Sequence, residues 1–165
     1  MESNPELKIQ LALFDKIIEG ICWLMFVVVW FIPIFYYTQL PEVVPLRFAF
    51  DGTVVGWGNK RTILVLPVIF TFVFILLSTI NYYPNTFNYL VKINKDNALK
   101  QYKLATRFIR YIKLIISIMF AFIVFDIAQM SLGSNLQFRN WIPFYIVIFI
   151  LIPVGIQIYL SIKNK

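Results

Sequence analysis

The chain alternates between four long hydrophobic stretches and shorter polar segments. The hydrophobic stretches cover residues 17–37, 62–80, 114–130 and 141–162. An α-helix needs about 20 mostly apolar residues to cross the hydrocarbon core of a bilayer, and each stretch comes near that length. The pattern predicts an all-α membrane protein, in which a four-transmembrane-helix bundle forms one integral membrane domain over residues 1–165.

The distribution of basic residues predicts how this bundle is oriented. Eleven of the fifteen Lys and Arg residues lie in the segment 81–113 or close to the two termini, and four lie on the other side of the predicted bundle. Positively charged loops stay in the cytoplasm. We therefore expect a multi-pass plasma-membrane protein with both termini and 81–113 in the cytoplasm, and with the loop 38–61 outside it.

The composition agrees with a membrane protein, and it excludes several kinds of partner, metal site and catalytic site. The chain is 60% hydrophobic and 14% charged, whereas about a quarter of the residues in a soluble domain are charged. Because the net charge of +7 gathers in the cytoplasmic segment, anionic lipid headgroups are the expected partner and nucleic acid is not. The chain has no histidine and one cysteine, Cys22, which excludes Cys/His zinc sites and histidine-assisted nucleophiles. We therefore expect that the chain is not an enzyme and that it binds no cofactor or metal.

The loop 38–61 carries the sequence signal of a small β-hairpin. The pair Asp51-Gly52 stands between the β-favouring runs 46–50 and 53–55, and Asp-Gly favours the two-residue turn of a hairpin. The glycines on either side of Trp57 predict a tight turn that lays the indole at the membrane interface, and Asn59 is expected to cap the second helix. The loop either only ties the first two helices together or binds a ligand or peptide.

The order of residues in this loop resembles a family of bacterial membrane proteins known as domain of unknown function 1648. The same domain occurs at the start of immunity proteins against the sporulation-delaying toxin. The family pattern is LPxxVPxHFxxxGxxDxWGxK, and this chain matches it at Leu40, Pro41, Val44, Pro45, Phe48, Gly52, Trp57, Gly58 and Lys60. The resemblance implies a bacterial plasma membrane, and it implies an immunity function as one of the roles such proteins have.

The chain departs from this family pattern at two positions. Arg47 stands where the pattern has histidine, and Val55 stands where it has aspartate. Arginine does not release its proton near neutral pH, so a role that needs a titrating imidazole or a His–Asp pair does not carry over. A guanidinium suits a carboxylate or phosphate group better than a metal. The candidate binding residues of the loop are Arg47, Phe48, Asp51, Trp57 and Lys60.

The segment 88–113 predicts a basic amphipathic helix, and it also resembles the equivalent segment of short four-span members of the family. Apolar residues recur at helical spacing on one face, and Lys100, Lys103, Arg107 and Arg110 follow the same period on another. Such a helix lies at the cytoplasmic headgroups, and it can continue directly into the third span. These four basic residues are therefore expected at the membrane surface, with regulation by a cytoplasmic partner as the alternative.

Asp126 is an acidic residue well inside a predicted span. A charged acid in lipid costs several kcal/mol, so an intramembrane acid needs a partner or a function. We hypothesise that Asp126 pairs with Arg47, Lys60 or Arg61 and ties the hairpin to the bundle. Ligand or proton chemistry is the alternative.

The sequence favours a non-enzymatic binding, sensing or protective protein whose outer loop engages a peptide or another envelope protein. A small permease or transporter accessory subunit that uses Asp126 is the alternative. A lipid-modifying enzyme would need paired acids, a nucleophile–base pair or a metal site, and the sequence shows no such arrangement.

Overall fold

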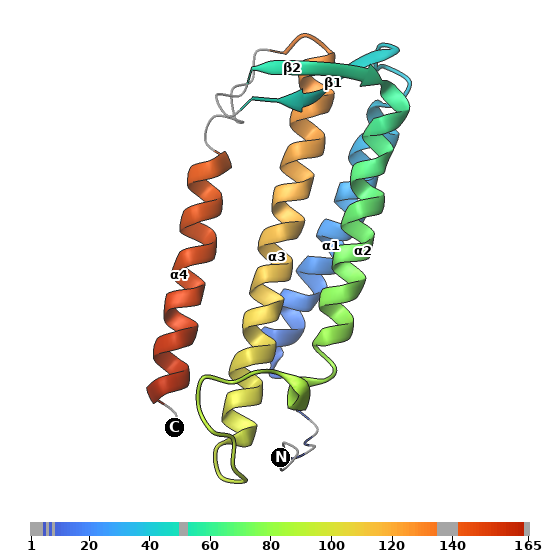
Figure 1. Cartoon of the computed structure of the whole chain (residues 1–165). Helices are drawn as coiled ribbons and strands as arrows, with labels where there is room; N and C mark the ends of the chain where they lie inside the picture. Colours follow the sequence, from blue (N-terminus) through green and yellow to red (C-terminus); the bar gives the residue numbers. More distant parts are fainter. Residues whose placement is uncertain (1–4, 6, 8, 50–52, 135–141, 164–165) are drawn as a thin grey trace.

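The protein is a bundle of long helices with a small β-hairpin lying across one end (Figure 1). The computed structural model describes residues 5, 7, 9–49, 53–134 and 142–163 (for 142–150, the course of the helix). Its long helices are α1 (Leu13–Tyr36), α2 (Val65–Ile80), α3 (Ala98–Ser131) and α4 (Ile142–Lys163). The remaining elements are the strands β1 (Val43–Phe48) and β2 (Val54–Asn59) and the 3₁₀ helices η1 (Lys60–Leu64) and η2 (Pro84–Thr86).

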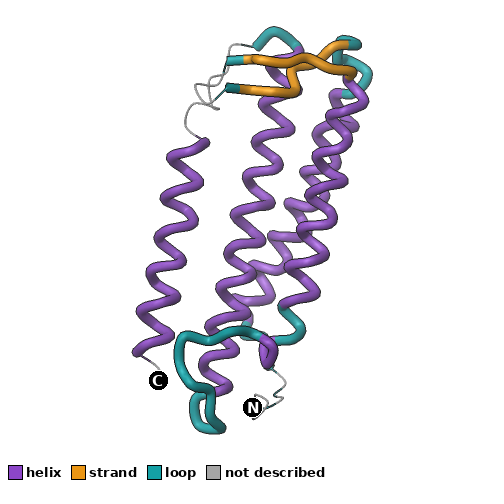
Figure 2. The backbone as a smooth tube through the Cα atoms, viewed as in Figure 1, coloured by secondary structure: helices purple, strands orange, loops and turns teal. Residues whose placement is uncertain are grey.

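The two ends of the bundle differ in what they carry. Figure 2 shows the strands at one end, and the α2–α3 connection together with both chain termini at the other. We call these the hairpin end and the terminal end. The helix α3 lies centrally, since it contacts α1, α2, α4 and β1.

Within the residues that the structure describes, three helical segments are long and apolar enough to cross a membrane, namely Leu13–Tyr36, Lys60–Ile80 and Ala98–Ser131. Only 22–28% of the residues in their most apolar windows are buried inside the protein, so most of the apolar side chains point outward. Phe72, for example, is 71% exposed. This arrangement indicates an integral membrane protein whose outer surface faces lipid. The part of α4 from Leu151 to Lys163 is also apolar, and the count of four spans stays a prediction.

The predicted amphipathic helix and the predicted third span form one continuous helix. With 34 residues, α3 is about 51 Å long at 1.5 Å per residue, which exceeds the roughly 30 Å of a hydrocarbon core. One part of α3 therefore extends beyond the apolar layer, and its basic residues lie at the terminal end of the bundle.

Among the described residues, two clusters of buried apolar side chains hold the elements together. The first joins α1, α2 and α3, and consists of Ile18, Cys22, Val29, Phe70, Phe74 and Ala121. The second lies at the hairpin end and consists of Leu40, Val44, Ile63, Val124, Ile127 and Ala128. An isolated two-stranded hairpin is marginally stable in water, so its packing on α3 through the second cluster is what holds it in place.

The predicted hairpin is confirmed, although its strands differ from the predicted runs. The strands β1 and β2 pair antiparallel from Val43 opposite Asn59 to Phe48 opposite Val54, with irregularities on either side of Arg47. The tight turn expected around Trp57 is wrong, because Trp57 and its two neighbouring glycines lie within β2. The Oδ1 atom of Asn59 accepts a hydrogen bond of 2.9 Å from the Arg61 backbone N–H, so Asn59 caps η1 at the start of the second apolar segment.

Close cross-strand packing explains the two glycines of β2. A Cβ atom on Gly58 would lie 2.2 Å from Cδ1 of Leu46, and one on Gly56 would lie 2.4 Å from Nε of Arg47. The side chains of β1 therefore lie directly across the backbone of β2. Leu46 also packs against the second cluster, which limits how far its side chain can move away.

Replacement of Gly58 tests this packing. We expect Gly58→Ala to lower the stability by about 1–3 kcal/mol, because the added methyl group overpacks the contact with Leu46. The control is Gly20→Ala, since a Cβ at Gly20 meets no atom within 4 Å and alanine favours the helix. Thermal unfolding of both variants in mild detergent compares them, and equal melting temperatures would contradict the packing argument.

The predicted topology is testable with single cysteines at two exposed positions. Thr53 lies at the hairpin end and Lys95 at the terminal end, and both are exposed, while the native Cys22 is buried. In a Cys22→Ser background, Thr53→Cys should react with a membrane-impermeant maleimide in intact cells. Lys95→Cys should react only after permeabilisation. Labelling of both from the same side would overturn the predicted orientation.

Candidate functional site

The hairpin carries most of the residues predicted to bind a partner. Arg47 is exposed and its side chain lies across Gly56, whereas Phe48 is half-buried against the second cluster. Trp57 is exposed and stands opposite Pro45. The ammonium group of Lys60 lies 2.9 Å from Oε1 of Glu42, and this hydrogen bond lowers the pKa of the Glu42 carboxyl. Asp51 lies outside the described residues.

Asp126 is buried in α3, between residues of the second cluster. Of the three cations proposed as its partner, Lys60 binds Glu42 instead. A pair between Asp126 and Arg47 or Arg61 stays a prediction.

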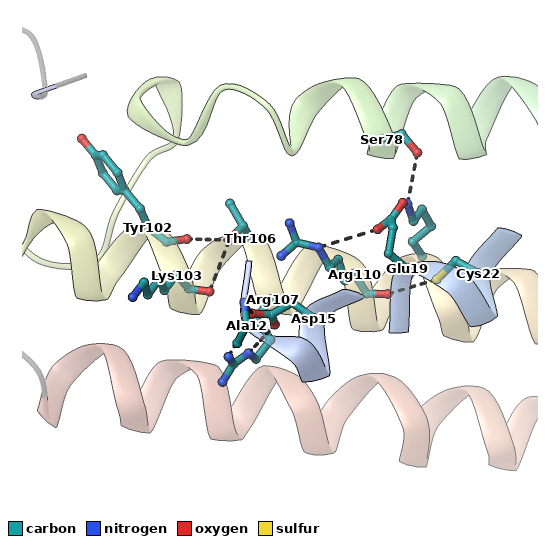
Figure 3. Close-up of polar contacts among 11 residues, drawn as sticks. Ala12, Asp15, Glu19, Cys22, Ser78, Tyr102, Lys103, Thr106, Arg107 and Arg110 are labelled. Carbon is teal, nitrogen blue, oxygen red and sulfur yellow. Dashed lines mark hydrogen bonds and ion pairs between the residues drawn. The ribbon is translucent and has the colours of Figure 1, made fainter. Parts of the chain in front are cut away.

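At the terminal end, acidic residues of α1 face basic residues of α3 (Figure 3). The acids are Asp15 and Glu19, four residues apart, and the bases are Arg107, Arg110 and Lys113, three residues apart. Residues at these spacings share one face of a helix, so the two charged faces meet over about two helical turns.

Asp15 and Arg107 form the first ion pair. Nε of Arg107 lies 2.8 Å from one carboxylate oxygen of Asp15, and a terminal guanidinium nitrogen lies 3.2 Å from the other. The second oxygen also accepts a hydrogen bond of 3.2 Å from the Ala12 backbone N–H. Bidentate pairs of this kind fix the relative orientation of the two groups, so the start of α1 is fastened to α3.

Lys113 is the centre of the second group of charges. Its ammonium group donates to Oε1 of Glu19 and to Oγ of Ser78, the latter at 3.2 Å. It also lies 4.7 Å from the centroid of the Phe74 ring, and its side chain is 1% exposed. The contacts therefore join α1, α2 and α3 at a buried ammonium group.

Arg110 also forms an ion pair with the carboxylate of Glu19. Its Nε lies 3.6 Å from Oε2 of Glu19, and within the described residues this buried nitrogen has no hydrogen-bond acceptor. The side chain of Arg110 is 8% exposed. Two cations, Arg110 and Lys113, are thus balanced by one carboxylate.

A cavity of about 490 Å³ lies beside these charges. Its polar lining consists of Glu19, Ser78, Asn81, Thr106, Arg110 and Lys113. Apolar walls come from Trp23 of α1 and from the N-terminal residues Leu7, Ile9 and Leu11. The side-chain oxygen of Asn81 is buried there without a hydrogen-bond donor in the part of the chain that the structure describes.

Two further contacts complete the terminal end. Gln101 and Ser161 exchange a pair of hydrogen bonds, from Nε2 of Gln101 to the Ser161 carbonyl at 3.0 Å and from Oγ of Ser161 to Oε1 of Gln101 at 2.9 Å. The hydroxyl of Tyr102 donates to the carbonyl of Pro5 at 2.9 Å. These bonds hold α4 and the N-terminal segment against α3.

The chain is similar to one protein family and to one curated relative. Residues 24–71 match the Domain of unknown function (DUF1648). The resemblance to this family is thereby confirmed, and the matched region runs from α1 through the hairpin into α2. A protein described as uncharacterized, from Archaeoglobus fulgidus, is 27% identical over 144 residues, which cover 79% of this chain and 76% of the relative. No solved structure matches the chain.

The charged cavity is a site that the sequence interpretation missed. The predicted surface position is wrong for Arg110, which is buried, and Arg107 is turned toward Asp15. Lys100 and Lys103 are exposed, and their contact with lipid stays a prediction. The missed signal was the matching helical spacing of the acids near the start of α1 and the bases of α3.

A double-mutant cycle on Glu19 and Lys113 tests the buried pair. Glu19→Gln should cost about 3–5 kcal/mol, because it leaves the Lys113 ammonium buried without its carboxylate. Lys113→Met should cost less, since Glu19 keeps Arg110 nearby. We expect the double variant to lose clearly less stability than the sum of the single variants, as measured by unfolding in mixed micelles. Additivity within about 0.5 kcal/mol would show that the two groups do not interact.

Proposed function

We propose that this chain is a non-enzymatic plasma-membrane protein that binds a peptide or another membrane-associated protein at its hairpin end. The observation that carries the proposal is a hairpin packed on α3 whose outward face is apolar, and which also exposes an arginine, Arg47, whose side chain lies across Gly56. Protection of the membrane against a peptide toxin is one form that such a role takes. The proposal places the hairpin outside the cytoplasm.

The mounting of the hairpin supports a preformed binding surface. Val44 of β1 is fully buried against α3, together with Leu40 before the hairpin and Ile63 after it. A surface that is already ordered costs little conformational entropy when a partner binds. The hairpin therefore meets the requirement for a rigid platform.

The composition of the outward face supports a protein or peptide partner. Val43, Val55 and Trp57 are 54–63% exposed, and among the described residues Arg47 has no carboxylate partner. Aromatic residues and arginine dominate the binding energy of many protein interfaces. A carboxylate of the partner would complement Arg47 while its apolar side chains cover Trp57.

Insertion of the same face into the lipid headgroups is the competing explanation, since tryptophan favours that region. The two explanations differ in what the side chain at position 55 touches. A photo-crosslinking amino acid at Val55, compared with one at Phe72 on the exposed surface of α2, separates them in native membranes. We expect a discrete peptide or protein adduct at position 55 and lipid adducts at position 72.

Two arginine variants make this experiment specific. Arg47→Ala should abolish the adduct at position 55, whereas Arg61→Ala, which removes an exposed arginine from η1, should leave it in place. Mass spectrometry of the adducts identifies the partner. If position 55 yields only lipid adducts, as position 72 does, the hairpin is a membrane-interface anchor and the proposal is wrong.

A further inference from the structure

We infer that the cavity at the terminal end binds the phosphate group of a glycerophospholipid. This site lies at the opposite end of the bundle from the proposed partner-binding face and does not depend on it. It is also separate from the exposed Lys100 and Lys103, because its basic residues, Arg110 and Lys113, are buried.

The charge of the cavity favours an anion. Arg110 and Lys113 contribute two positive charges to its lining, and Glu19 contributes one negative charge. The neighbouring Asp15–Arg107 pair adds no net charge. Among the described residues, one positive charge is therefore left without compensation beside buried side chains, where an unpaired charge is costly. A bound anion would neutralise it.

The unused hydrogen-bonding groups narrow the chemistry of that anion. In the part of the chain that the structure describes, Nε of Arg110 has no acceptor and the side-chain oxygen of Asn81 has no donor, and both residues line the cavity. A phosphate oxygen accepts from guanidinium groups with good geometry. A hydroxyl or ammonium group of the same headgroup would donate to Asn81. The ligand thus carries a phosphate and a nearby donor, as phosphatidylglycerol does.

The apolar walls favour a lipid over free phosphate as the source. Trp23, Leu7 and Leu11 line the cavity and are themselves 36–53% exposed. Trp23 belongs to a helix whose outward residues, such as Leu24 and Val27, form the lipid-facing surface. An acyl chain can therefore leave the cavity along this surface while its headgroup stays among the charged residues.

Native mass spectrometry of the full chain, purified in mild detergent, tests the inference. The protein is offered phosphatidylglycerol, phosphatidylcholine or diacylglycerol in equal amounts. We expect phosphatidylglycerol to be retained best, phosphatidylcholine less because its headgroup has no donor, and diacylglycerol not at all because it has no phosphate. Equal retention of all three would overturn the inference.

Charge variants locate the bound lipid. Arg110→Gln should lower the retained phosphatidylglycerol about tenfold or more, the effect of losing a charge-assisted hydrogen bond. Lys103→Gln removes the same charge from an exposed position of the same helix and should change retention little. Asn81→Asp keeps the size of the side chain and places a negative charge in the cavity, so it should also reduce binding. Equal losses in Arg110→Gln and Lys103→Gln would show surface attraction only.

Inorganic phosphate distinguishes the two sources of the phosphate group. A rise in melting temperature with inorganic phosphate that disappears in Arg110→Gln, without retention of phosphatidylglycerol, would assign the site to free phosphate. Retention of the lipid that depends on Arg110 assigns it to the phospholipid. If neither ligand binds in an Arg110-dependent way, the cavity is not a phosphate site.

Discussion

The buried ammonium group of Lys113 is the constraint on which the arrangement of the helices depends. Its side chain is 1% exposed, and a buried charge is costly unless a nearby group of opposite charge neutralises it. Glu19 of α1 is the acid that does so. This pairing favours one alignment of α1 against α3, because a shift by one turn would separate the Lys113 ammonium from the Glu19 carboxylate. The Asp15–Arg107 pair repeats the constraint nearer the start of α1, and together the two pairs set the register of the helices.

The structure of the hairpin end depends on close packing of side chains and not on ion pairs. Its core consists of aliphatic side chains of the loop, the hairpin, η1 and α3, and such contacts do not specify partners as ion pairs do. Specificity comes instead from close approach, since Leu46 and Arg47 of β1 occupy the space that side chains at Gly58 and Gly56 would need. Because the ion pairs have already set how α1 and α3 lie together, the loop that follows α1 reaches the end of α3 at a defined place.

The sequence predicts those features that depend on local patterns. Long apolar runs predicted the membrane helices, Asp51-Gly52 predicted the hairpin, and the residues of the loop pointed to the DUF1648 family. Features that depend on the rotation of one helix against another were missed. Helical spacing shows that Arg107 and Arg110 share a face of α3, but only the packing of α1 shows that this face is turned inward. Gly56 and Gly58 were interpreted as turn residues. Their real role is to leave room for the side chains of β1, and this role can be recognised only when the strand register is known.

The two candidate sites are also separate in their relation to the family. The DUF1648 match covers residues 24–71, which include the whole hairpin but none of the charged residues that line the cavity. The resemblance therefore bears on the hairpin end, whereas the support for a ligand in the cavity comes from its charge and its hydrogen-bonding groups. Within the described residues, the buried Nε of Arg110 has no hydrogen-bond acceptor. A buried cation that serves only to hold helices together would be expected to use its donors, as Arg107 does with Asp15. Nε of Arg110 has no acceptor among the described residues, whereas Nε of Arg107 donates to Asp15. This difference between two arginines one turn apart is the reason to assign the cavity to an anionic ligand.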